Sequence, residues 1–191
     1  MSRVALEPAS LIFPTPVVMV SCRDRGEKAG NIITIAWTGI LSSAPPHVGI
    51  AIRPERYSFQ LIKESGEFVI NLPSQDLVYA TDYCGVNSGR DVDKFAVLGL
   101  TAAPATKVDA PMIAECPVNL ECRVKQVVDL GAHHYFISEV VATHAREDLV
   151  LKHGRVNWEK AGLIAYRQGE YMELGKVLGV HGFSHRSAPQ S

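Results

Sequence analysis

The chain contains 191 residues, of which 47% are hydrophobic and 20% charged, and its formal net charge at pH 7 is -1. This balance excludes a disordered or collagen-like chain, and the scattered lysines and arginines argue against a nucleic-acid partner. Because domains usually contain roughly 100–200 residues, we expect a single domain over 1–191, with its core over about 14–183.

The sequence does not predict a membrane-bound or exported protein. No segment approaches the roughly 20 apolar residues of a membrane span, and Glu7 and Pro8 interrupt the N-terminal region where a signal peptide needs a long apolar run. The four cysteines, at positions 22, 84, 116 and 122, form no Cys-x-x-Cys pair and have no paired zinc spacing. We therefore expect a cytoplasmic protein with reduced thiols.

Short strands at close spacing dominate the chain. The expected strands, in chain order, are residues 17–22, 31–41, 48–53, 67–72, 118–128, 135–143, 163–166 and 171–174. Helices are expected at 58–65, with Ser58 as N-cap, and from Ser74 to about Tyr83, and a polar glycine-rich loop follows at 84–94. Many strands with few helices predict a mainly β fold, a closed antiparallel barrel with peripheral helices. A doubly wound α/β fold is disfavoured, because strands and helices do not alternate.

The expected strand at 31–41 has two unlike faces. Its bulky residues, which we expect to form a buried face, are Ile33, Ile35 and Trp37. The small residues that alternate with them are Thr34, Ala36 and Thr38. A face of small residues would let a flat ligand lie close to the strand and form hydrogen bonds with its backbone.

A basic loop follows the next strand. Arg53 and Arg56 lead to Ser58 at the expected start of a helix, where cations, free backbone N–H groups and the helix dipole favour a phosphate. Ser42 and Ser43, before a double proline, could add hydroxyl donors. The alternative is that the two arginines are solvated surface charges, that Ser58 only caps the helix, and that the two serines are ordinary turn residues. A flat-ligand surface beside a phosphate site suggests a mononucleotide cofactor.

The polar loop at 84–94 allows two interpretations. Gly85 and Gly89 would let its backbone approach a ligand closely, and Lys94 could direct a cation towards a cofactor. These residues by themselves are more typical of a mobile surface loop. Cys84 could be a redox thiol, although a single cysteine is more often buried and inert.

Two adjacent histidines, His133 and His134, invite a metal-site hypothesis. Adjacent residues on a strand point to opposite faces, so the pair cannot easily bind one ion, and no Asp, Glu or Cys lies at a helpful spacing. We therefore expect no metal site. A single histidine at the mouth of a cofactor site, titrating near neutrality, is the better functional interpretation.

Taken in order, these segments resemble the flavin reductase-like family, whose fold is the FMN-binding split barrel, and within it the flavoredoxin branch most of all. The resemblance extends over about 14–182. The segments that carry it are 31–37 (NIITIAW), 42–46 (SSAPP), 53–58 (RPERYS), 67–71 (EFVIN), 88–95 (SGRDVDKF), 131–140 (GAHHYFISEV), 171–175 (YMELG) and 181–183 (HGF).

The resemblance implies a role for each matched residue. The flavin ring would be contacted, largely through backbone groups, by Thr34, Ala36, Trp37 and Thr38. The phosphate would be contacted by Ser42, Arg53, Arg56 and Ser58. Lys94 would approach the cofactor from its loop, and His133 would lie near the ring, on the side where reductases of the family bind the nicotinamide.

The resemblance also implies a homodimer with its flavin near the subunit interface. The expected function is an oxidoreductase that passes electrons from NAD(P)H through bound FMN, or FAD, to free flavin or a protein. Reductases of the family usually carry an acid where this chain has Ala132. The alternatives are a flavoredoxin-type carrier reduced by a partner protein and a flavin-binding barrel without turnover.

Overall fold

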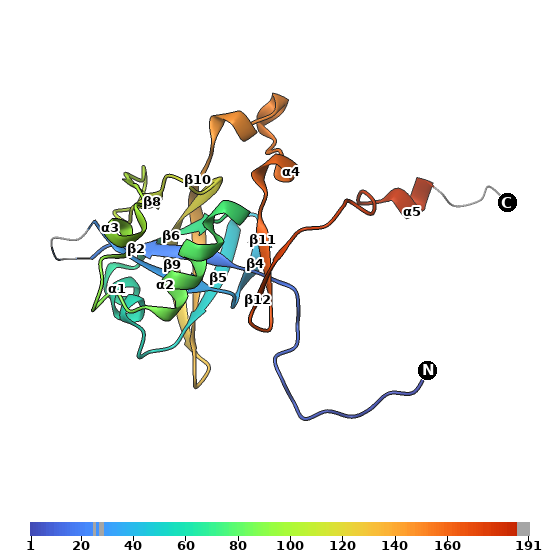
Figure 1. Ribbon diagram of the computed structural model, residues 1–191, viewed down its shortest axis with the longest axis horizontal. Helices are drawn as coiled ribbons and strands as arrows, with labels where there is room; N and C mark the ends of the chain where they lie inside the picture. Colours follow the sequence, from blue (N-terminus) through green and yellow to red (C-terminus); the bar gives the residue numbers. More distant parts are fainter. Residues whose placement is uncertain (25, 27–28, 187–191) are drawn as a thin grey trace.

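The computed structural model describes residues 1–24, 26 and 29–186, and its body is a seven-stranded antiparallel sheet (Figure 1). The strand order across the sheet is β3-β2-β6-β9-β10-β5-β4. The strands are β2 (Val18–Cys22), β3 (Asn31–Ile35), β4 (Thr38–Ser43), β5 (Pro46–Ile52), β6 (Glu67–Leu72), β9 (Val118–Asp129) and β10 (His134–Ala145).

The sheet curls because its two edge strands are consecutive in the chain. Only Ala36 and Trp37 join β3 to β4, so the opposite edges of the sheet must lie close together. The Ala51 N–H donates to the Trp37 carbonyl at 2.9 Å, which ties this link to β5. The result is the expected mainly β architecture, an antiparallel split barrel.

Smaller elements surround the barrel. A three-stranded sheet is formed by β1 (Thr15–Pro16), β11 (Ile164–Arg167) and β12 (Glu170–Glu173), and a two-stranded one by β7 (Ala102–Ala103) and β8 (Met112–Ile113). The helices are α1 (Tyr57–Ser65), α2 (Val78–Val86), α3 (Lys94–Leu98), α4 (Trp158–Ala161) and α5 (Phe183–Arg186), with 3-10 turns η1 (Gln75–Leu77), η2 (Glu147–Leu149) and η3 (Lys152–Gly154). Of the helices in the described ranges, none is long and apolar enough to cross a membrane.

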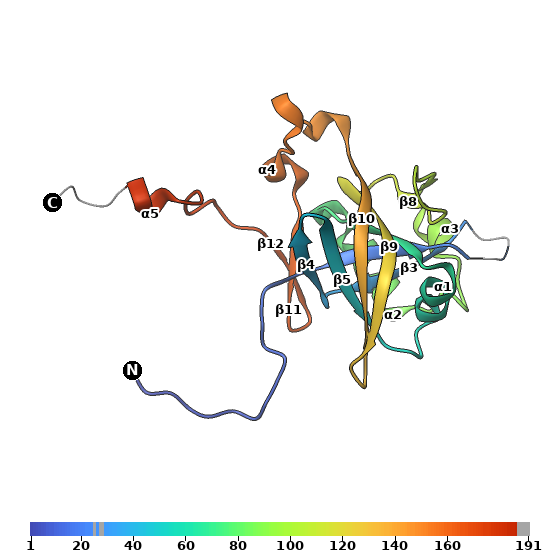
Figure 2. The same cartoon turned by 180° about the vertical axis from the view of Figure 1, so that it is seen from behind.

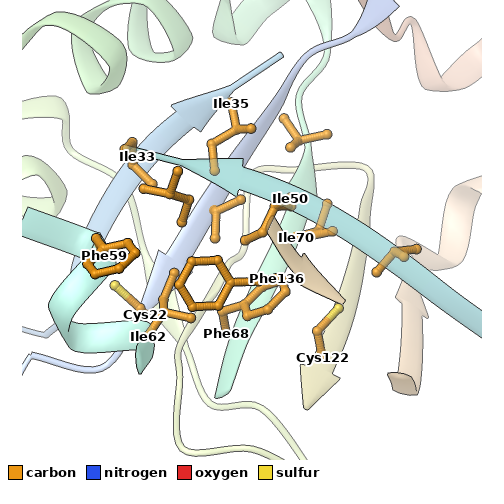
Figure 3. Packing of buried hydrophobic residues seen from close by; sticks show 14 residues of the cluster. Cys22, Ile33, Ile35, Ile50, Phe59, Ile62, Phe68, Ile70, Cys122 and Phe136 are labelled. Atoms are coloured by element: carbon orange, nitrogen blue, oxygen red, sulfur yellow. The ribbon is translucent and has the colours of Figure 1, made fainter. Parts of the chain in front are cut away.

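The inside of the barrel is the main hydrophobic core, shown in Figure 3. Phe59 from α1 packs edge-on against Phe136 from β10, with ring centroids 5.5 Å apart. Figure 3 shows Phe68 from β6, Ile50 from β5 and Ile62, also from α1, converging on the same point. Helix α1 therefore closes one end of the barrel with its apolar face.

Both terminal segments leave this body (Figures 1 and 2). The chain after β12 extends into solvent, and its Val177 and Leu178 side chains are exposed. Leu6 and Ile12 in the N-terminal segment are likewise exposed.

The main correction to the predicted elements concerns the single strand expected at 31–41. It is two strands, because the chain bends at Ala36 and Trp37 so that β4 can pair with β5 at the other edge of the sheet. Ile33 and Ile35 are in the core as expected, but Trp37 is 49% exposed.

The helices and the polar loop also differ from expectation. Arg56, without a side-chain cap bond, is the N-cap of α1, so the prediction that Ser58 caps this helix was wrong. Helix α2 extends to Val86 and shortens the expected loop. Helix α3 was not expected, and the Asp93 side chain caps it by accepting from the Ala96 N–H at 3.1 Å.

A fully buried carboxylate, that of Glu121 on β9, holds a neighbouring loop against the sheet. It accepts from Thr106 N–H and Oγ1, both at 2.8 Å, from Lys107 N–H at 2.6 Å and from Val108 N–H at 3.1 Å, and lies 2.5 Å from His144 Nε2. Burial by itself would raise the pKa of Glu121, but these hydrogen bonds hold it at about 2.

Replacing this carboxylate should therefore make stability depend less on pH. Because the pKa falls from 4.5 to about 2 on folding, its contribution is complete above pH 4.5 and is lost as pH falls through about 2. Glu121→Gln should lower the free energy of unfolding at pH 7 by about 1–3 kcal/mol, and the difference should narrow below pH 4.5, measured by urea denaturation across pH. Glu173→Gln, an exposed control on β12, should stay within about 0.5 kcal/mol of the wild type. A difference that does not change with pH would contradict this account.

Candidate functional site

A cavity of about 320 Å³ lies at the rim of the barrel where β3 bends into β4, and we call it the main cavity because most of the predicted site residues line it. Its walls come from β3 and the bend, the loop after β5, α2, the β9–β10 connection and the β11–β12 hairpin. Its volume falls within the roughly 300–1,000 Å³ of small-molecule and cofactor sites. One side is backbone and small side chains, represented by Thr34 and Ala36.

A second cavity, of about 180 Å³, adjoins the main one, and the two share Ile33, Arg56 and Gly85. Three cationic side chains line it, those of Arg56, Arg90 and Lys94. Glu55 is the one acidic side chain in this lining, and it lies 3.4 Å from Arg53. The positive excess and the first turn of α1 make this cavity suited to an anion.

Ser58, in the first turn of α1, contributes a buried hydroxyl to the second cavity. Its Oγ accepts a hydrogen bond of 2.7 Å from Nδ2 of Asn31, the first residue of β3. The loop passes so close to this pair that a Cβ on Gly89 would lie 1.9 Å from Asn31 Oδ1. Glycine at this position is therefore what lets the loop close the cavity.

Lys94 is buried, with 3% of its surface exposed. Its Nζ donates to the Ile32 carbonyl on β3 at 2.6 Å and to the Cys84 carbonyl on α2 at 2.8 Å. Burial lowers the pKa of Lys94, and the charge of Arg56 acts in the same direction. An ammonium group has three N–H donors, so one remains for a ligand in the cavity.

The outer wall of the second cavity is a stack that sequence reasoning missed. The Arg90 guanidinium lies over the Tyr57 ring, 5.2 Å from its centroid, and donates to the Glu55 carbonyl at 3.2 Å. The Tyr57 hydroxyl in turn donates to Asp24 Oδ2 at 3.0 Å. The sequence placed Arg90 in a glycine-rich loop. It could not show that this side chain turns inward, because the orientation of a loop side chain depends on its packing partners.

At the mouth of the main cavity the Trp37 and His133 rings are nearly parallel, 11° apart with centroids separated by 6.0 Å. His134 points the other way and packs edge-on against Phe59 in the core, with centroids 5.0 Å apart. The two histidines thus face opposite directions, as expected of neighbours on extended backbone. Within the described ranges no group of three or more His, Cys, Asp or Glu side chains could hold a metal ion.

The opposite wall of the main cavity is the β11–β12 hairpin, which sequence reasoning did not associate with the site. Tyr171 on β12 donates from its hydroxyl to Asp82 Oδ1 on α2 at 3.1 Å. Its ring packs edge-on against Tyr166, with centroids 5.7 Å apart. Burial and the Asp82 charge raise the pKa of Tyr171, so this phenol remains a donor near neutral pH.

The structure brings most of the predicted site residues together. The main cavity is lined by Thr34, Ala36, Trp37, Arg53, Arg56 and His133, and the second cavity by Arg56, Ser58 and Lys94. Two residues lie in neither lining. Thr38 Oγ1 donates to the Gly49 carbonyl at 2.9 Å, and Ser42 is exposed on the edge strand β4. Within one chain these two are separated from the phosphate-site candidates.

Cys84 lines the second cavity but does not present a reactive thiolate. Burial raises its pKa to about 11, so the group is a thiol at neutral pH. The side chain of Thr34 is also engaged internally, because its hydroxyl donates to the Thr81 carbonyl on α2. The β3 face that a ligand can reach is therefore mainly backbone.

Comparison with known proteins identifies a family. Residues 10–175 match the family model described as "Flavin reductase like domain". Two similar solved structures are flavoredoxins. That of Desulfovibrio vulgaris (Miyazaki F) is 32% identical with a TM-score of 0.87, covering 94% of this chain and 97% of that one. That of Methanosarcina acetivorans is 27% identical with a TM-score of 0.86, covering 97% and 100%. An NADPH-flavin oxidoreductase of Streptomyces viridifaciens is 28% identical over 76% of this chain and 75% of its own length.

Proposed function

Because the chain belongs to the flavin reductase-like family, we propose that its two adjoining cavities bind FMN, with the ring in the main cavity and the phosphate in the second. The observation that supports this most is their junction at Arg56, which lines both cavities. FMN has the same design, a planar ring joined by a short chain to a terminal phosphate.

The donor set of the second cavity fits a phosphate monoester. Arg56, Arg90 and Lys94 supply positive charge, and the Ser58 hydroxyl and the start of α1 supply hydrogen-bond donors. The close approach of Gly89 limits this cavity to about 180 Å³. We therefore favour FMN over FAD, whose adenosine would have to extend beyond it.

The ring end of the site fits a protein that holds a flavin and controls access to it. Thr34, Ala36 and Trp37 would present backbone to the ring, and His133 would lie beside it. When bound, the flavin supplies hydride and electron transfer, and the protein provides binding and orientation and sets the electrostatic environment.

We further propose that electrons pass from NAD(P)H through FMN to free flavin or a protein acceptor. The relative named as an NADPH-flavin oxidoreductase supports this candidate, and His133 at the cavity mouth would lie beside the donor. A second candidate is an electron carrier reduced by another protein, supported by the similarity to flavoredoxins over nearly the whole chain. Four buried free cysteines are consistent with a reducing compartment, so we place the protein in the cytoplasm.

A homodimer would complete the site. On the edge strand β4, Ile40 is 85% exposed and Leu41 45%, and the exposed Trp37 directly precedes this strand. Pairing of this edge with a second copy would bury these side chains and could carry Ser42 and Thr38 to the partner's cofactor. The exposed apolar residues of both terminal segments favour the same arrangement.

Loss of Arg56 should weaken FMN binding mainly through the phosphate, because its charge has no partner on the neutral ring. Losing a hydrogen-bonded charge pair between an arginine and a phosphate raises the Kd by about tenfold or more. Arg56→Ala should therefore raise the Kd for FMN by that factor and leave the Kd for riboflavin nearly unchanged, measured by flavin fluorescence quenching. Arg146→Ala, whose side chain pairs with Asp148 and lines neither cavity, is the control. Equal effects on both flavins would argue against this phosphate assignment.

Anaerobic reduction separates the two candidate functions. NADH or NADPH added to the FMN-loaded protein should bleach the flavin absorbance within seconds. His133→Ala should slow this reduction while the Kd for FMN stays within about twofold, because the histidine is proposed to act beside the donor. Bleaching by a reduced redox protein but by neither nicotinamide would favour the carrier. A protein that does not bind added FMN would overturn the cofactor proposal.

The dimer proposal makes a separate prediction about mass. The wild-type protein should elute with a light-scattering mass of twice the 20.8 kDa of one chain. Ile40→Glu should shift the population towards monomer, because a charge would be buried in the apolar edge contact. Val97→Glu, which changes another exposed apolar residue on α3, 59% exposed, should remain dimeric. A wild-type protein that is monomeric throughout would refute the proposal.

A further inference from the structure

The hydroxyl of Ser58 is held in one hydrogen-bonding role by its neighbours. Asn31 Nδ2 donates to its Oγ at 2.7 Å, which occupies one of the oxygen's lone pairs. The Cys22 thiol beside this pair donates to the Asn31 backbone carbonyl at 3.7 Å, and burial raises its pKa to about 12, so the thiol keeps its proton. Because the Asn31 amide already donates to this oxygen, the Ser58 hydroxyl has its own proton to offer to a ligand that only accepts hydrogen bonds.

Asn31 is itself held from several directions. It is 3% exposed, begins β3, and pairs with Cys22 on β2 in the sheet register. Its Oδ1 faces the loop so closely that a Cβ on Gly89 would lie 1.9 Å away, so the amide cannot rotate freely. β3, α1 and the loop after α2 therefore meet at this one side chain.

We infer that Asn31 is a positioning residue of the phosphate site, which fixes the Ser58 hydroxyl as a donor and thereby raises affinity for a terminal phosphate monoester. This inference rests on the proposed binding of FMN. Every polar group then presented by Ser58, Arg56, Arg90 and Lys94 is a donor, which matches a ligand group that has only acceptor oxygens.

The chemistry at position 31 determines the effect. Aspartate has the shape of asparagine but only accepts hydrogen bonds, so it would take the Ser58 proton for itself. Ser58 would then present a lone pair to the phosphate, next to an added negative charge. Alanine would remove the amide without adding charge, and would leave the hydroxyl unrestrained.

The cavity offers a matched control for the charge. Asn87 also lines the second cavity, but its Nδ2 donates to the Tyr83 carbonyl at 3.1 Å, not to Ser58. Asn87→Asp therefore adds the same charge to the same cavity without changing the donor role of Ser58.

The test compares FMN with riboflavin, which lacks the phosphate. We expect the ratio of the riboflavin Kd to the FMN Kd to fall about tenfold or more in Asn31→Asp and less in Asn31→Ala. The riboflavin Kd should stay within about threefold in each variant, and the ratio in Asn87→Asp should fall by no more than about threefold. In a Ser58→Ala background the effect of Asn31→Asp should shrink, because the residue acts through that hydroxyl.

The outcomes distinguish this inference from the proposed function. If the wild-type protein binds neither flavin, the proposed function is overturned, and the inference with it. If both flavins bind but the ratio is unchanged in Asn31→Asp, or Asn87→Asp lowers it equally, only the positioning role is overturned. Equal weakening of both flavins by Asn31→Asp and Asn31→Ala alike would reduce Asn31 to a structural residue.

Discussion

The two-residue link between β3 and β4 is the constraint from which the site follows. These strands occupy opposite edges of the seven-stranded sheet, yet only Ala36 and Trp37 connect them. A flat sheet would place its edges far apart, since neighbouring strands are separated by roughly 4.8 Å, so the sheet has to curl until the edges nearly meet. The bend lies at the rim thus formed, and its exposed backbone becomes one wall of the main cavity. The short link between β3 and β4 therefore accounts both for the closure of the barrel and for the position of the main cavity.

The second cavity follows from β3 being an edge strand. An edge strand has backbone groups with no strand partner, and proteins usually cover or occupy such groups. Here Lys94 covers the Ile32 carbonyl, and α2 packs so closely that a Cβ on Gly85 would lie 3.3 Å from Thr34 Cβ. The loop between α2 and α3 is thereby held over the start of α1, which brings its Arg90 towards Arg56. The contacts that cover the edge of β3 therefore also form the cationic second cavity.

The sequence predicted what depends on local pattern and missed what depends on distant partners. Alternation located nearly the whole of β9, and a short apolar run located β6 at Glu67–Leu72, whose residues 68–71 are buried on both faces. The same alternation continued through Ala36 and Trp37, so it could not show that the strand ends there to reach another edge. The inward turn of Arg90 and the amide contact of Asn31 depend on packing between segments distant in sequence, which composition does not record. The family resemblance supplied the grouping that periodicity could not.

The side chains at the two ends of the proposed site differ in how firmly their contacts hold them, and this difference affects how the protein would work. At the phosphate end Asn31, Ser58 and Lys94 are almost fully buried and each makes hydrogen bonds to other elements, so moving one requires breaking several contacts. At the ring end, by contrast, the mouth is lined by the Trp37–His133 stack, in which Trp37 is 49% exposed, and the hairpin wall is tied to α2 by the Tyr171–Asp82 hydrogen bond. For the proposed FMN, a rigid anchor at the phosphate and an adaptable opening at the ring would keep the ring in place while different donors or acceptors reach it. Partner choice would then evolve at the opening without loss of cofactor binding.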